Sequence, residues 1–224
     1  MASVSQNTLR VFLRETLLSL SEEAVSPVAA AARGLALYIE SSGIGDYVLY
    51  SADKAVKALQ GMSGETNRAM KKALIASHAI VGSLRVSTPN HTRRETVNTV
   101  AHSAAEKGYG PLLYDAALAY ASPLTADRES VSLSAERVWQ YYYERRSDVV
   151  HEPIAKTRGS RVHVKSRPWL NHAYSMPQAS SSTNVLTTRH DDVVNTLSEL
   201  STADIEEALV GAGGLYFDSK YVEA

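Results

Sequence analysis

The N-terminal part of the chain carries a helical pattern of apolar residues. These residues recur at intervals of three and four positions: Leu9, Phe12, Leu13, Leu17 and Leu20. Such spacing places them on one face of a helix, so we predict an amphipathic helix over residues 5–20. Only Arg10 and Arg14 could bind a charged membrane surface. We therefore expect this helix to dock on its own domain or on a partner.

Shorter apolar segments follow and indicate a sheet with helices around it. Residues 34–39 and 47–50 alternate in the manner of strands, with Gly43 and Gly45 between them, which predicts a hairpin. Further on, the pattern predicts helices at 52–62 and 65–75 and strands at 79–87 and 95–103. This order of elements favours an α/β arrangement in which helices pack on a sheet.

The last third of the chain contains a short strand candidate, a turn-rich stretch and two helices. Val162 and Val164 alternate with polar residues, and residues 166–182 are rich in proline and serine, as linkers often are. The helices are expected at 186–200 and 204–209, and a cluster of glycines at 211, 213 and 214 is expected to end the second one.

We accordingly divide the chain into three parts. Residues 1–26 form the N-terminal amphipathic helix, residues 27–175 form the central domain, and residues 183–224 form a C-terminal helical extension. The two terminal parts, which carry apolar stripes, are the expected docking surfaces for a protein partner.

Composition and charge exclude several classes of function. The 224 residues are 44% hydrophobic and contain no cysteine, which excludes disulfides, thiolate metal sites and a cysteine nucleophile. The net charge of -1 provides no overall positive field for nucleic-acid binding. We see neither a signal peptide nor an apolar run of the roughly 20 residues that span a bilayer. We therefore expect a soluble cytoplasmic protein.

A glycine-containing turn stands between the predicted strand at 95–103 and the helix that follows it. Gly108 and Gly110 let the backbone approach a ligand closely and direct successive N–H groups toward one point. The helix that begins near Pro111 adds its positive end, worth about 0.3–1 kcal/mol per anionic charge. The turn is therefore either a phosphate site or a tight strand-to-helix connection that binds nothing.

Three segments around this turn resemble one protein family. They are K-G-Y-G-P-L-L-Y-D, the stretch from D-R-E-S-V-S to Y-Y-Y-E-R-R-S-D-V, and W-L-N-H-A-Y-S. These segments resemble GNAT (Gcn5-related N-acetyltransferase)-like proteins of tailed bacteriophages. The resemblance implies an α+β fold with a mixed, mostly antiparallel sheet flanked by helices. It also implies a phage-encoded protein that acts in the host cell or is carried in the virion.

The family resemblance carries an expected activity and cofactor. It implies an N-acyltransferase that takes acetyl-coenzyme A and an amine acceptor, and that holds the coenzyme's pyrophosphate on Lys107, Gly108, Tyr109 and Gly110. Two positions depart from the family pattern. Ala105 stands where the family has arginine or glutamine, and Pro111 has no N–H to donate. Lys107 could supply a compensating charge.

Acetyl transfer requires a base for the amine and an acid for the departing thiolate. His102, late in the strand before the glycine turn, is the candidate base, because a pKa near 6.5 suits that role. Tyr142 or Tyr143 is the candidate acid, by analogy with the family. Each has a structural alternative: His102 as a hydrogen-bonded strand residue, and the tyrosines as core packing around Trp139. No metal site is predicted, and His190-Asp191-Asp192 is interpreted as an acidic helix N-terminus.

Two function classes therefore remain open from the sequence. The first is the acyl-coenzyme-A-dependent N-acyltransferase, which the Gly-x-Gly pattern and the tyrosines favour. The second is a GNAT-shaped virion or interaction protein without catalysis, which Ala105 and Pro111 favour.

Overall fold

The computed structural model describes most of the central and C-terminal parts of the chain. The described residues are 24–40, 43–93, 95–155, 165–176 and 183–222. The helix predicted over residues 5–20 and the strand predicted at Val162 and Val164 lie outside these ranges. No helix within them is long and apolar enough to cross a membrane.

The centre of the molecule is a seven-stranded sheet with the order β1-β2-β3-β4-β5-β7-β6. Its strands are β1 (Leu35–Ile39), β2 (Gly45–Ser51), β3 (Ile80–Ser87), β4 (Asn98–Ala105), β5 (Leu124–Ala126), β6 (Val150–Pro153) and β7 (His172–Ser175). All neighbouring strands are antiparallel except β4 and β5, which are parallel. The expected mixed, mostly antiparallel sheet with flanking helices is confirmed.

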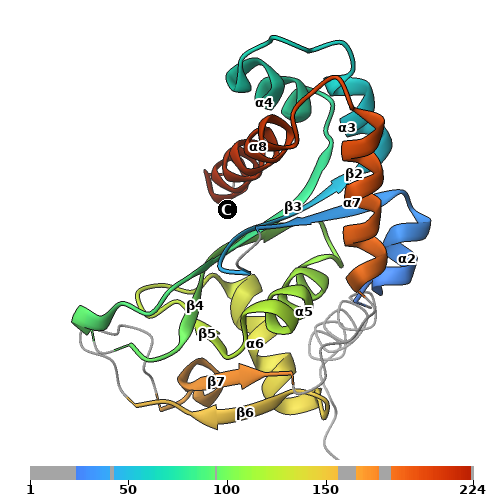
Figure 1. Cartoon of the computed structure of the whole chain (residues 1–224). Coiled ribbons are helices and arrows are strands. Elements are labelled where there is room, and N and C mark those ends of the chain that lie inside the picture. The colour runs from blue at the N-terminus through green and yellow to red at the C-terminus, as the bar shows by residue number, and fades with distance from the viewer. Residues whose placement is uncertain (1–23, 41–42, 94, 156–164, 177–182, 223–224) are drawn as a thin grey trace, which may run out of the picture.

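Seven α-helices surround this sheet in the described ranges (Figure 1). They are α2 (Pro27–Ala32), α3 (Ala52–Leu59), α4 (Asn67–Ala76), α5 (Gly110–Ala121), α6 (Leu133–Arg145), α7 (Asn184–Thr196) and α8 (Thr202–Val222). Ser26, Thr66 and Ser132 begin three of the helices, and each side chain accepts a hydrogen bond from the amide three residues later. Such capping satisfies an amide that has no partner inside the helix.

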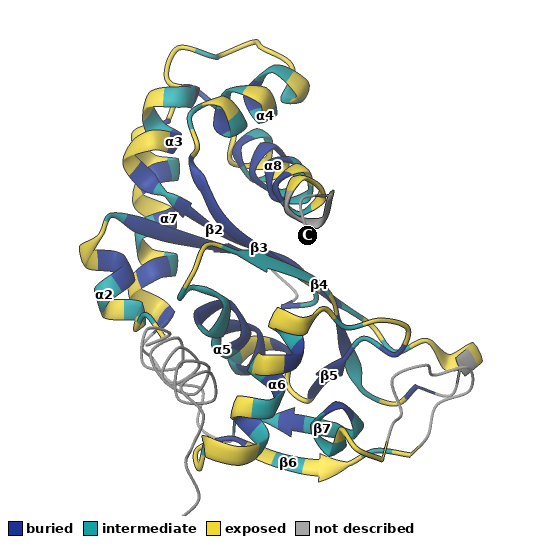
Figure 2. Ribbon diagram, turned by 180° about the vertical axis from the view of Figure 1, so that it is seen from behind, coloured by how far each residue is buried: buried dark blue, intermediate teal, exposed yellow. Residues whose placement is uncertain are grey.

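Two apolar clusters cover the two faces of the sheet. The alternation along β2 divides its side chains, so that Tyr47 and Leu49 join one cluster while Val48 and Tyr50 join the other. The first cluster includes the inner residues of α5 and α6, and the second those of α3, α4 and α8. Figure 2 shows the buried residues along β2 and β3 and on the sides of α5 and α8 that face them. Helix α7 packs beside β1.

Several local predictions are confirmed. The hairpin is present, with Leu37 of β1 opposite Leu49 of β2. The helix predicted at 65–75 is α4, the one predicted at 186–200 is α7, and the strand predicted at 95–103 is β4, displaced by a few residues.

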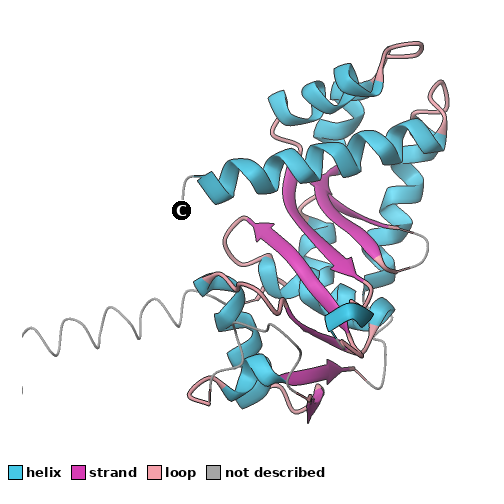
Figure 3. Ribbon diagram, turned by 90° about the vertical axis from the view of Figure 1, so that its left-hand side faces the viewer, coloured by secondary structure: helices cyan, strands magenta, loops and turns pink. Residues whose placement is uncertain are grey.

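Two predictions for the C-terminal third are wrong. The glycines do not end the last helix, because α8 runs through them from Thr202 to Val222 and lies across one face of the sheet (Figure 3). The stretch predicted as a linker contains β7, which pairs with β6 over four residues. Tyr174 of β7 is fully buried, and its hydroxyl donates to the Trp169 carbonyl at 2.6 Å. Burial of this aromatic ring stabilises a strand that the surrounding turn residues conceal in the sequence.

Candidate functional site

The glycine turn lies where β4 leaves the sheet and α5 begins. β4 and β5 are paired only from Asn98 opposite Leu124 to Val100 opposite Ala126. β4 continues to Ala105, so in the described part of the chain its last four residues, 102–105, have a strand partner on one side only, namely β3. The second edge of this segment has no strand partner among the residues that the structure describes.

The pairing with β3 shows which groups face that unpaired edge. The Glu106 amide donates to the Val81 carbonyl at 2.9 Å. Hydrogen-bonded pairs alternate along an antiparallel ladder. Ser103 and Ala105 therefore direct their N–H and C=O groups away from β3, toward the unpaired side. An unpaired strand edge of this kind offers backbone hydrogen bonds to an extended ligand.

The glycine turn itself leaves backbone amides unused. Gly108 has a φ of 89°, which a residue with a side chain rarely adopts. Its carbonyl accepts from the Val25 amide at 3.1 Å, and the Tyr109 amide donates back to Glu106 at 3.1 Å. Among the described residues, the amides of Gly108 and Gly110 have no acceptor. They are free to bind an anion at the positive end of α5.

Gly110 has no close neighbour among the described residues. A Cβ atom built on Gly110 would meet no heavy atom of the described chain within 4 Å. Two expected contacts are missing, since Pro111 has no N–H and the methyl group of Ala105 cannot bind phosphate. The turn can accommodate a phosphate group, with fewer donors than the family pattern would supply.

Sequence reasoning missed a cation that the fold brings to this turn. Arg33 follows α2, and its guanidinium donates to the Tyr109 hydroxyl at 3.0 Å. The two residues are 76 positions apart, so no local motif could have paired them. Arg33 and Lys107 are both exposed, which places two positive charges around the turn.

His102 lies on the opposite side of β4 from α5. Its ring stacks on Phe217 of α8, with ring centroids 4.4 Å apart, whereas the neighbouring Ser103 hydroxyl lies 2.9 Å from the Tyr114 hydroxyl of α5. The His102 Nε2 atom is buried without a hydrogen-bond partner. Burial and the nearby Arg85 lower the pKa of His102, so the ring is neutral at pH 7.

Tyr142 lies inside the core, beneath the first turns of α5. It is fully buried, and its hydroxyl is 2.7 Å from Asp115 Oδ1 and 3.2 Å from the Pro111 carbonyl. Arg146 completes the cluster through its contact with the same carboxylate at 3.0 Å. Burial and Asp115 raise the Tyr142 pKa well above its ordinary value. These contacts anchor α6 to α5.

Tyr143 points elsewhere, toward the β6–β7 hairpin. Its ring centroid is 4.6 Å from that of His151 and 5.0 Å from that of His172. The described structure thus distributes the three predicted catalytic residues over three surroundings: α8, the α5–α6 contact and the β6–β7 hairpin. It does not bring their side chains into contact.

No family model, curated protein or solved structure matches this chain. Within the residues that the structure describes, no group of three or more histidine, aspartate or glutamate side chains could hold a metal ion. The glycine turn, the adjacent edge of β4 and the surrounding side chains therefore form the candidate functional site.

Proposed function

We propose that this chain is a GNAT-like, phage-encoded N-acyltransferase that uses an acyl-coenzyme A and acts on an amine. One observation supports the proposal: an edge of β4 that has no strand partner among the described residues leads directly into a glycine turn, where the amides of Gly108 and Gly110 have no acceptor among those residues. The phage origin rests only on the resemblance of residues 107–115, 127–149 and 169–175 to phage-encoded GNAT-like proteins.

The chain's own residues divide the binding of the coenzyme between them. The amides of Gly108 and Gly110 would hold the pyrophosphate at the α5 N-terminus, with Arg33 and Lys107 as nearby positive charges. The amide groups of the coenzyme's extended arm would complement the backbone groups of Ser103 and Ala105. The bound coenzyme would supply the activated thioester.

His102 is the candidate for the base. Its lowered pKa keeps the imidazole neutral, so that Nε2 can accept a proton, and this atom has no competing partner. Nε2 is buried on the α8 side of β4, so an acceptor amine would reach it only if α8 moved away from this face. Tyr142 is a weaker candidate for the acid than the sequence suggests, since its hydroxyl is occupied by Asp115.

The second candidate function is a GNAT-shaped virion or interaction protein that does not catalyse. The internal hydrogen bond of Tyr142, the loss of a donor at Pro111 and the methyl side chain of Ala105 all favour it. In this case the fold would persist while the acyl chemistry was lost.

Thiol release from acetyl-coenzyme A in the presence of a panel of primary amines separates the two candidates. The enzyme proposal predicts amine-dependent thiol release that falls about 100-fold in His102→Gln, the loss of a general base. His91→Gln, at an exposed histidine of the short helical turn His91–Arg93, is the matched control and should retain full activity. Coenzyme binding without turnover would favour the non-catalytic protein, and no binding at all would exclude the proposed site.

A further inference from the structure

Two polar atoms are buried beneath α8, on one face of the sheet. Ser83 of β3 is opposite Ala104 of β4, and Arg85 is opposite His102. Because side chains alternate between the faces of a sheet, Ser83 and His102 point to the same side. Ser83 Oγ and His102 Nε2 are both buried, and neither has a hydrogen-bond partner among the described residues. When α8 covers these atoms they lose water and gain no bond, so their burial destabilises the covered arrangement.

Helix α8 packs firmly only in its first half. That half contributes four buried apolar side chains, those of Ile205, Ala208, Leu209 and Ala212. After Gly214, Tyr216 is buried and its hydroxyl donates to the Val81 carbonyl at 3.2 Å, while Phe217 is half-buried against His102. The other side chains described in this second half are exposed. Two aromatic residues therefore hold the end of α8 on the sheet.

Glycines separate the two halves of α8. Gly211, Gly213 and Gly214 occupy the middle of the helix, where glycine is less favourable than any residue except proline. Close approach to the sheet explains Gly213, since an added Cβ would lie 3.0 Å from Ser83 Oγ. Packing does not require Gly214, because an added Cβ there meets no heavy atom of the described chain within 4 Å. This glycine weakens the helix at the point where its firmly packed half ends.

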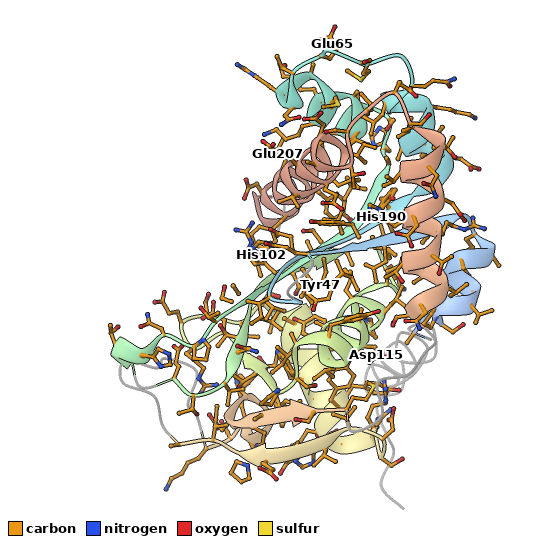
Figure 4. The ribbon with its side chains drawn as sticks, in the orientation of Figure 1. Tyr47, Glu65, His102, Asp115, His190 and Glu207 are labelled. Atoms are coloured by element: carbon orange, nitrogen blue, oxygen red, sulfur yellow. The ribbon has the colours of Figure 1, made fainter. Side chains whose placement is uncertain are left out.

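We propose that the last turns of α8, from Gly214 onward, form an autoinhibitory cap over His102 that opens at the glycines. His102 lies beneath this end of α8 (Figure 4), and Phe217 stacks on its ring. Opening exposes Ser83 Oγ and His102 Nε2 to water or to a polar substrate, which offsets the lost contacts of Tyr216 and Phe217. The regulatory role rests on the proposed acyltransferase, whereas the opening itself is a property of the fold.

Acylation of the full chain by diethyl pyrocarbonate at pH 7 tests the cap without coenzyme or amine. The reagent attacks a neutral imidazole nitrogen, and NMR of the histidine rings shows which nitrogen has reacted. Because burial lowers the His102 pKa, its ring is neutral at this pH, and a slow reaction reports that the atom is covered. We expect His102 Nε2 to react at least about tenfold more slowly than the exposed His91, in proportion to the open population.

Three variants of the cap give different expected rates. Phe217→Ala removes the stacking contact and should accelerate the reaction at His102 Nε2 about tenfold. Leu215→Ala is the matched control and should leave the rate unchanged, because Leu215 is 42% exposed. Gly214→Ala should slow the reaction about threefold, since alanine strengthens the helix at the hinge. Thermal unfolding establishes that each variant is folded.

His190 reports any opening elsewhere in the same molecule. It lies in the middle of α7, not at a helix N-terminus as predicted, and well away from His102 (Figure 4). It is 8% exposed, its Nδ1 lies 2.8 Å from the Tyr50 hydroxyl, and its rate should not change in Phe217→Ala.

Three results would overturn the cap. They are equal acceleration of His102 and His190 in Phe217→Ala, equal effects of Phe217→Ala and Leu215→Ala, and a wild-type rate at His102 Nε2 as fast as that of His91. Thiol release plays no part in this measurement, so a failure of the proposed acyltransferase would leave its result unchanged.

Discussion

Two glycine-containing segments of this chain have opposite physical uses. In the turn before α5, Gly110 faces open space, with no heavy atom of the described chain within 4 Å of an added Cβ. In α8, a Cβ on Gly213 would lie 3.0 Å from both Ser83 Oγ and Val48 Cγ2. The first glycine has no close neighbour among the described residues, whereas the second lets a helix approach the sheet.

The difference has consequences for the whole molecule. Close approach of α8 brings the Tyr216 hydroxyl within 3.2 Å of the Val81 carbonyl and places Phe217 against His102. Helix α8 thus covers one face of the sheet and closes the surroundings of the candidate base. At the turn, by contrast, an added Cβ on Gly110 meets no described neighbour, and the Gly108 carbonyl accepts from the Val25 amide.

The largest effect on stability is expected where the glycine is in contact. Gly213→Val adds three carbon atoms to a position that already has neighbours at 3.0 Å. Overpacking of this kind costs about 1–3 kcal/mol, and we expect the upper half of that range. Urea unfolding measures it. An unchanged free energy of unfolding would mean that α8 does not pack on Ser83 and Val48 as described.

A smaller loss is expected at the turn, and for a different reason. Gly108→Ala forces a residue with a side chain to adopt a φ of 89°. The cost is about 1–2 kcal/mol and arises from the backbone conformation. The same urea titration measures it, with Gly110→Ala as the control, because that position has neither a positive φ nor a close neighbour. Equal losses in the two variants would contradict the conformational explanation.

The smallest effect should have the opposite sign. Gly214 is next to Gly213 in α8, but an added Cβ there meets no atom of the described chain within 4 Å. Gly214→Ala should therefore stabilise the protein by about 0.5–1 kcal/mol through helix propensity. Thermal unfolding would show the melting temperature rise. A fall would place Gly214, like Gly213, in contact with the rest of the protein.

Local patterns in the sequence predict part of this fold. The β1–β2 hairpin and the strand, turn and helix around Gly108 follow from alternation and from glycine placement within a few residues. The length of α8 could not be predicted in that way, because glycine ends many isolated helices. Only the contacts of Gly213 with Ser83 and Val48, which are distant in sequence, explain why this helix continues.

The glycine turn and the groove beside β1 also differ in how far apart their residues lie in the sequence. The glycine turn is contiguous in sequence and was predicted, although Arg33, which approaches it from 76 residues away, was not. By contrast, a groove beside β1 draws its lining from β1, α5, α7 and α8, and His190 in that lining contacts Tyr50 across 140 positions. No local motif marks such a site, so only the folded arrangement reveals it.

Binding of acetyl-coenzyme A to the wild-type chain and to Gly110→Asp, measured by calorimetry, tests the central claim most directly. The new carboxylate has open space, so the fold should be retained, and its negative charge would repel a phosphate at the free amides. We predict binding by the wild-type chain and complete loss in the variant, with an unchanged melting temperature. Equal affinity in both chains, or no binding by either, would contradict the assignment of this turn as a coenzyme site.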